Sequence, residues 1–189
     1  MALKNHLSHR SLARTPVAMG LLLLAAILLI GWPGLAAAQA PEPRRTLDLD
    51  RFMGRWHEIL RTPNDHQRDC WAGAQVWARS QPGRFSIRQT CHRGSATGPI
   101  RTINTTARVL DTTTNAKFEA SFFGGLIRQR YWVIDIAPDY SWMIATTADG
   151  KFPALLSRSP TMSAAQRQRL MARMGQLGLP TGQLEASGG

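Results

Sequence analysis

The two cysteines, Cys70 and Cys91, are the side chains best suited to covalent chemistry in this sequence of 189 residues. The N-terminal residues of this chain predict export, and a single pair of cysteines in an exported chain is typical of a disulfide. A metal site needs more ligands at short spacing, whereas His57, His66 and His92 are scattered along the chain. We therefore predict a disulfide, no metal site and no cofactor.

Nucleophilic catalysis finds little support in the sequence. Ser95 lies in Gly94-Ser95-Ala96-Thr97-Gly98, one place too early for the G-x-S-x-G turn that exposes a catalytic serine. No close pair of carboxylates with a neighbouring histidine stands out on one predicted strand face. We expect no enzyme and no catalytic residues. Two alternatives stay open: an isomerase or hydrolase, and an envelope protein that recruits other proteins without storing a ligand.

The first 38 residues follow the order of regions in a secretory signal peptide. Lys4, Arg10 and Arg14 form a basic start, residues 17–32 are mostly apolar, and Pro33-Gly34 with small residues comes next. The apolar run is short for a membrane span. We therefore predict a cleaved leader, with an uncleaved segment that holds the protein at the envelope as the alternative.

Two small-residue sites compete for the cleavage, ending at Ala38 and at Ala40. Pro41 would follow the second cut, and its fixed φ and missing N–H fit a protease groove poorly, which favours cleavage after Ala38. The leader holds no cysteine that could be acylated. We expect a protein that is soluble in the periplasm or secreted.

The charge balance is strongly basic. Of the 23 basic and 12 acidic residues, three basic and no acidic ones lie in the leader, so the remainder carries a net charge of +8. Such a surface favours anionic partners. The charges are mostly single arginines without a nucleic-acid motif, so we expect no nucleic acid and consider peripheral contact with an anionic membrane surface.

Eight strand-like runs separated by turn residues follow residue 46, which is typical of an all-β sandwich or barrel. Apolar and polar residues alternate in several of them: Phe118, Ala120 and Phe122 face one way and their neighbours the other. An eight-stranded barrel is just wide enough to be filled by side chains or to hold one small ligand. The runs are Trp56–Arg61, Trp71–Ser80, Arg84–Cys91, Arg101–Leu110, Lys117–Phe123, Tyr131–Ile136, Trp142–Thr147 and Phe152–Ser157.

The end of the chain changes to a helical pattern. Ser163 is a good N-cap, and Leu170, Met171 and Met174 form one apolar stripe, so we predict a helix at about 163–175 packed on the outside of the barrel. A helix on a membrane surface is the alternative. The domain plan is a flexible arm at 39–46, a barrel with this helix at 47–184 and a disordered tail at 185–189.

Three short motifs resemble the lipocalin family in their residues and order. Gly54-Arg55-Trp56 opens the first strand, Asp139-Tyr140 lies between two late strands, and Arg158 follows the last one. The sequences of residues 117–124 and 131–136 are similar to those of the bacterial outer-membrane lipocalins. The resemblance covers roughly residues 47–184 and implies an eight-stranded antiparallel up-and-down barrel with one outer helix.

The residues of these motifs also have physical roles of their own. Gly54 lets the chain bend into the first strand, Trp56 can plug the barrel floor, and Arg158 can lie over its indole as a cation–π partner. Cys70 and Cys91 should lie nearly opposite each other in a hairpin that turns at residues 81–83. Their bridge would close a loop of about 20 residues, worth roughly 3 kcal/mol.

The resemblance implies a carrier of a fatty acid or lysophospholipid rather than a catalyst. Bulky aromatics are a usual pocket wall, and Arg128 and Arg130, expected in a loop at the barrel mouth, could receive a carboxylate or phosphate. His57 stands where the subgroup usually has Tyr, which makes it a neutral interior imidazole or a modifier of pocket polarity. The predicted lining residues are Trp77, Phe118, Phe122, Tyr131 and Trp142.

Overall fold

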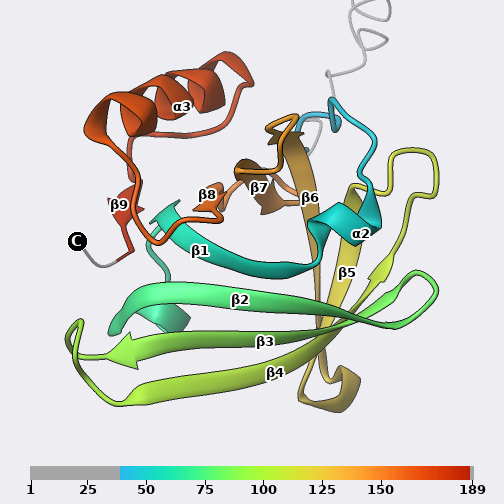
Figure 1. Cartoon of the computed structure of the whole chain (residues 1–189), viewed down its shortest axis with the longest axis horizontal. Coiled ribbons are helices and arrows are strands. Elements are labelled where there is room, and N and C mark those ends of the chain that lie inside the picture. The colour runs from blue at the N-terminus through green and yellow to red at the C-terminus, as the bar shows by residue number, and fades with distance from the viewer. Residues whose placement is uncertain (1–38, 188–189) are drawn as a thin grey trace, which may run out of the picture. The chain divides into compact units, whose positions relative to one another are not determined.

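Antiparallel strands with short connections form most of the chain (Figure 1). The structure is a computed structural model and describes residues 39–187. It also contains the helices α2 (Leu49–Phe52) and α3 (Ala164–Gln176) and a short strand β9 (Glu185–Ala186). The eight long strands are β1 (Gly54–Arg61), β2 (Cys70–Gln81), β3 (Arg84–Arg93), β4 (Ile100–Val109), β5 (Lys117–Phe122), β6 (Ile127–Ile136), β7 (Trp142–Thr147) and β8 (Ala154–Ser157).

The sheet closes on itself. Consecutive strands pair from β2 to β8, β8 pairs with β1, and Gly54–His57 of β1 returns to Trp77–Ala74 of β2. Closure removes the exposed edges that an open sheet presents. The predicted eight-stranded antiparallel up-and-down barrel with one outer helix is confirmed.

The strands alternate in direction, so their connections gather at two ends of the barrel. We call the end with α2 the floor end: it holds residues 82–83, 110–116 and 137–141. The backbone of Leu47 donates to Thr114 O at 2.7 Å, and Arg51 donates to Pro138 O at 3.0 Å, which ties the α2 segment to two of these connections. The mouth end holds residues 62–69, 94–99, 123–126 and 148–153.

The barrel wall separates two apolar clusters. One is inside and is centred on Trp56, Phe85 and Phe118. The other is outside, where Leu170 and Met174 of α3 pack against outward residues of β6, β7 and β8. Strand alternation sends successive side chains to opposite faces, and the helix gives the outward apolar residues a second core.

The tail was predicted to be disordered, but its described part is not. Glu185 and Ala186 pair with Arg61 and Leu60 at the mouth end of β1. Ser187 then accepts from Ala72 N at 3.0 Å and donates to Ile59 O at 3.2 Å. The tail therefore fills the place where β1 and β2 have separated, because their unpaired backbone groups need partners.

The N-terminal arm and β6 also differ from the sequence expectation. In the arm, expected to be flexible, Ala40 N donates to Ala148 O at 2.9 Å and Arg44 N to Ile134 O at 3.0 Å. Strand β6 begins at Ile127, so residues 127–130, expected in a loop, belong to the barrel wall. Pairing of Arg130 with Glu119 of β5 offsets the charge that made this stretch look like a loop.

The disulfide joins Cys70 and Cys91, as predicted. It lies at the mouth end, and its Cα atoms are 5.3 Å apart. Cys70 stands opposite Arg93 in the strand register, two residues beyond Cys91, because the β2–β3 pairing shifts between Trp71 and Ala74. Within residues 39–187, the helices are too short or too polar to cross a membrane.

Candidate functional site

The floor of the barrel is sealed by Trp56 and Arg158. The Trp56 indole is fully buried and donates to Phe52 O at 2.9 Å. The Arg158 guanidinium carbon lies 3.7 Å from the indole centroid, which is cation–π distance. Its nitrogens donate to Arg55 O at 2.8 Å and to Arg51 O at 2.6 Å. Burial lowers the pKa of Arg158, and the guanidinium stays charged because its ordinary pKa is so high.

The other motif residues complete this floor. Gly54 has a φ of +94°, and a side chain there would strain the turn from α2 into β1. The Tyr140 hydroxyl accepts from Asp48 N at 2.7 Å, which holds the N-cap residue of α2. Asp139 accepts from Ser141 N and Oγ, and these bonds hold the pKa of its carboxyl below the usual range. All five motif residues build the closed end.

Above the floor, an aromatic cluster fills the barrel interior. Trp77 and Phe118 each contact Phe52, Phe85 and one another, with centroids 5.1 to 5.9 Å apart. Trp77 and Phe118 are both buried in it. Both lie in the packed floor half of the interior, and their predicted contact with a ligand stays a prediction.

Nearer the mouth, the inward face becomes polar. The register places Gln75 beside Trp56, and Gln89 next to it on β3. Gln75 Oε1 accepts from the Trp77 indole at 2.7 Å, and Gln89 donates to Thr105 Oγ1 at 3.3 Å. Buried polar groups need partners. The two hydrogen-bonded pairs, Gln75 with Trp77 and Gln89 with Thr105, lie side by side on the inner face of β2, β3 and β4, and we call them the polar band.

Tyr131 faces this band from β6. It is the register partner of Phe118 on β5 and packs against the inner cluster, so it faces inward, and burial raises the pKa of its hydroxyl. The hydroxyl makes no hydrogen bond within residues 39–187 but keeps contact with solvent, since Thr146 Oγ1 is the one fully buried side-chain polar atom there without a partner. Phe122 is also inward and half-buried, and Ala145 of β7 and Ala154 of β8 present small side chains to the same interior. These side chains are smaller or less buried than the aromatic cluster at the floor.

A buried arginine closes the seam between β1 and β2 at the mouth. Arg61 is 5% exposed and donates to Glu58 Oε1 at 2.8 Å and to Glu185 Oε1 at 3.0 Å. Its second terminal nitrogen donates to Cys70 O at 2.9 Å. Gly73 is required beside this pair, since an added Cβ would stand 2.9 Å from Glu58 Oε1.

Two predicted anion-binding residues lie outside the barrel. Arg128 and Arg130 alternate with the inward Tyr131, and both reach Glu119 on the outer wall, at 3.6 and 3.4 Å. Arg108 reaches the same carboxylate at 2.9 Å. Strand alternation therefore turns these guanidinium groups away from the interior, although Arg128 directly follows the mouth turn.

Trp142 and His57 also face outward. Trp142 packs with the outer cluster near α3, so it does not lie with the other predicted lining residues. His57 stands opposite Ser157 and follows the inward Trp56, so it is not an interior imidazole. Burial, with help from Arg55, lowers the pKa of His57 and favours the neutral ring.

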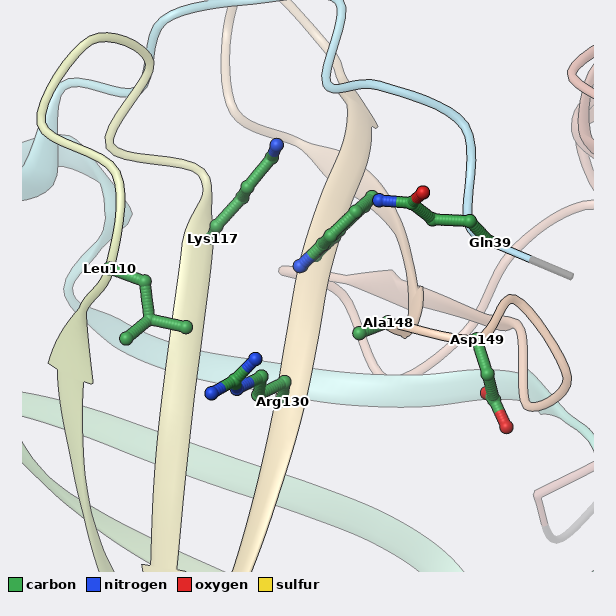
Figure 2. A pocket seen from close by; sticks show the side chains of 7 residues that line it. Gln39, Leu110, Lys117, Arg130, Ala148 and Asp149 are labelled. Atoms are coloured by element: carbon green, nitrogen blue, oxygen red, sulfur yellow. The ribbon is translucent and has the colours of Figure 1, made fainter. Parts of the chain in front are cut away.

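Open hollows occur on the outside of the wall. One of about 480 Å³ lies against β5 and β6 (Figure 2). There Lys117 lies over the Trp132 ring, with Nζ 4.3 Å from the centroid, and pairs with Glu42. A second, of about 420 Å³, lies beside Tyr140 at the floor end. The first is lined by Gln39, Leu110, Lys117, Arg130, Trp132, Ala148 and Asp149.

Several residues that shape the interior were not foreseen. Gln75 and Gln89 had a signal, because each lies two residues from an inward apolar residue of its strand, Trp77 and Ile87. Arg61 had none, since its partners come from positions 58, 70 and 185. Among residues 39–187, no group of His, Cys, Asp or Glu side chains is placed to hold a metal.

Comparison with known proteins gives a match to a family model and no match to a curated protein. Residues 47–187 match the family model described as a lipocalin-like domain. A sequence search of curated proteins found no match.

Solved structures with the same fold are distant in sequence. Lobster apocrustacyanin A1 is 12% identical, with a TM-score of 0.58, 82% of this chain and 92% of that chain covered. Insecticyanin from the tobacco hornworm Manduca sexta is 15% identical, with a TM-score of 0.60 and coverage of 78% and 85%. The cockroach allergen Per a 4 is 14% identical, with a TM-score of 0.60 and coverage of 80% and 95%. At these identities the likeness concerns the fold alone.

Proposed function

The chain belongs to the lipocalin family, and on that premise we propose that it carries a fatty acid or lysophospholipid in the mouth half of its barrel. The lipocalin fold generally binds small hydrophobic ligands.

One observation carries the position of the ligand. Trp77, Phe85 and Phe118 pack together above the sealed floor, whereas Tyr131, the register partner of Phe118, and Phe122, nearer the mouth, are only half-buried. A hydrocarbon chain gains most where it covers apolar side chains that are still partly wet. The ligand then rests on Trp77 and Phe118 and is enclosed by Phe122 and Tyr131.

The polar band favours an amphiphile over a pure hydrocarbon. The Tyr131 hydroxyl lacks a protein partner, and Gln89 and Thr105 lie across the same interior. A hydroxyl that is still reached by solvent can bond a polar group of a ligand in place of water. A ligand with a hydrocarbon chain and a carboxyl or glycerol group supplies both kinds of contact. This chemistry is shared by fatty acids and lysophospholipids.

Export fits this function, because free lipid is met at the cell envelope. We propose that residues 1–38 are removed as a leader. They lie outside the described residues, which begin at Gln39. Ala40 is buried and hydrogen-bonded to Ala148 O, so a cut after Ala40 would remove a residue that packs on the barrel. Packing of Ala40 thus supports the cut after Ala38.

Native mass spectrometry of the exported protein, before and after delipidation, tests the proposal. We expect one fatty acid or lysophospholipid per chain before treatment and its return when the lipid is added back. The intact mass also gives the N-terminus. A protein that stays empty, and whose tryptophan fluorescence ignores added fatty acid and lysophospholipid, would refute the carrier function.

A further inference from the structure

Exposed apolar side chains gather at the mouth end. Of the large hydrophobic residues that are exposed within residues 39–187, all but Leu110 lie in or next to mouth connections. A soluble surface carries single exposed apolar residues everywhere, so their concentration at one end is informative. The mouth residues are Trp71, Ile100, Phe123, Leu126, Ile127 and Phe152.

The turn between β5 and β6 carries the most exposed of them. Phe123, Leu126 and Ile127 are 70%, 84% and 49% exposed, and Figure 1 shows their turn at the end of the barrel away from α2. Phe123 has a φ of +51°, which non-glycine residues rarely adopt. Gly124 and Gly125 complete the left-handed turn, at +68° and +104°. We call residues 123–127 the mouth turn.

A basic collar stands directly behind the mouth turn. Arg128 and Arg130 project outward from β6 with well-exposed side chains. The nearby carboxylate, Glu119, is only 9% exposed and is already shared with Arg108. From residue 120 to 134 the sequence contains no acid. The outward charge beside the apolar tip is therefore positive.

We propose that the mouth turn docks the barrel on a bilayer that contains anionic phospholipid. Apolar side chains on a protruding turn enter the headgroup boundary, and basic residues behind them meet the negative surface. The positive charge beside these apolar side chains favours an anionic lipid surface as the partner. Docking would bring the barrel opening to a source of its ligand; that purpose rests on the function proposed above, while the docking itself does not.

Vesicle flotation tests the docking. The exported protein, with its N-terminus read from the intact mass, is mixed with vesicles of phosphatidylcholine plus phosphatidylglycerol, or of phosphatidylcholine alone. We expect binding to the anionic vesicles that weakens with salt. Phe123→Ser with Leu126→Ser should lower the partition coefficient at least about tenfold. Arg128→Gln with Arg130→Gln should lower it roughly fivefold per arginine and flatten the salt dependence.

Matched controls come from the same chain. Leu110→Ser changes an exposed apolar residue at the floor end, and Arg169→Gln changes an exposed arginine on α3. Both should bind vesicles like the unmodified protein. Circular dichroism checks that every variant is folded. Docking is wrong if the unmodified protein ignores anionic vesicles, if the Phe123/Leu126 variant binds them equally well, or if that variant changes self-association instead.

The ligand content of the same proteins separates this inference from the carrier function. We expect the Phe123/Leu126 variant to keep its lipid by native mass spectrometry, because neither residue faces the interior band. Lipid-loaded protein that ignores vesicles would overturn docking alone. Empty protein whose vesicle binding depends on the mouth turn would uphold docking and overturn the carrier function.

Discussion

At the floor, one guanidinium performs several structural tasks. Arg158 covers the Trp56 indole and donates to carbonyl groups of α2 and β1. Its removal leaves those carbonyls without partners and exposes one face of the indole. The residue therefore acts on stability, and on ligand binding only through the seal.

Replacing Arg158 by Ala should lower the free energy of unfolding by about 2–4 kcal/mol, because charge-assisted hydrogen bonds and a cation–π contact are lost together. Urea unfolding measures the change. Arg158→Lys should recover less than half of it, since an ammonium cannot reach the same carbonyls. Arg55→Ala, at an exposed neighbouring position, is the control and should cost less than about 0.5 kcal/mol. A negligible change in the free energy of unfolding for Arg158→Ala would contradict a floor held together by Arg158.

Tyr131 gives a pH signature of the interior. Burial raises the pKa of its hydroxyl, so the folded state holds this proton more tightly than the unfolded state. Its contribution to stability is therefore present below the unfolded pKa of about 10 and is lost as the pH rises above that value.

Tyr131→Phe should remove this loss while keeping the ring packing. Urea unfolding of the ligand-free proteins at pH 8 and above pH 10 should show a smaller decline in stability for the variant. Equal declines for the Tyr131 variant and the unmodified protein would argue against a buried phenol.

At the scale of elements, β9 and Arg61 join the two strands that separate at the mouth. Arg61→Met should lower the free energy of unfolding by about 3–5 kcal/mol, because Glu58 loses its buried partner. Glu185→Gln should cost less than about 1 kcal/mol, since that side chain is 44% exposed. Thermal and urea unfolding compare the two. Similar small effects would mean that β9 is held by its backbone pairing alone.

On the outer face of β4, β5 and β6, the arginine side chains Arg108, Arg128 and Arg130 all pair with the carboxylate of Glu119. A hydrogen bond from Arg108 holds the pKa of Glu119 below its usual range, with Arg130 and Arg128 acting in the same sense. A depressed folded pKa gives stability that is present above the unfolded pKa of about 4.3 and is lost as the pH falls through the folded value. Acid unfolding should therefore include a step that disappears in Glu119→Gln. An unchanged acid transition would contradict this pairing.

Local patterns predicted the strands because alternation and turn residues act over a few positions. Apolar and polar residues alternate within the runs, as at Phe118 and Ala120 in β5, and glycine and proline residues separate the runs. These two signals placed most of β1 to β8. The start of β6 was missed because Arg128, Gln129 and Arg130 look like a loop until Glu119 is placed beside them. The pairing of β9 was missed because it depends on β1, more than 120 positions earlier.

The site was predicted less well than the fold, for a physical reason. Trp142 looks like an interior residue, but α3 makes the outer face of β7 apolar as well, so hydrophobicity no longer identifies the face. His57 had a usable signal, since strand alternation after the inward Trp56 places it outside. The Arg61 cluster had no signal, because it joins three segments that are separate in sequence.

At the scale of the whole molecule, the two ends differ in kind. The floor is packed and sealed by Trp56 and Arg158, whereas the mouth carries exposed apolar residues and a half-buried interior. Such asymmetry is what a carrier needs, because a ligand must enter at one end and be retained at the other. We therefore expect the ligand to lie inside the mouth half.

A larger side chain placed in the mouth half is the most direct test of this ligand position. Ala145 and Ala154 stand side by side on the inner face, so Ala145→Phe should occupy the space of the ligand. Ala78→Phe, at an exposed position on β2, is the matched control. Delipidated proteins are titrated with a fatty acid and with a lysophospholipid, and binding is followed by calorimetry. We predict that Ala145→Phe stays folded and binds at least about tenfold more weakly, while Ala78→Phe binds like the unmodified protein; undiminished binding by folded Ala145→Phe would contradict the account.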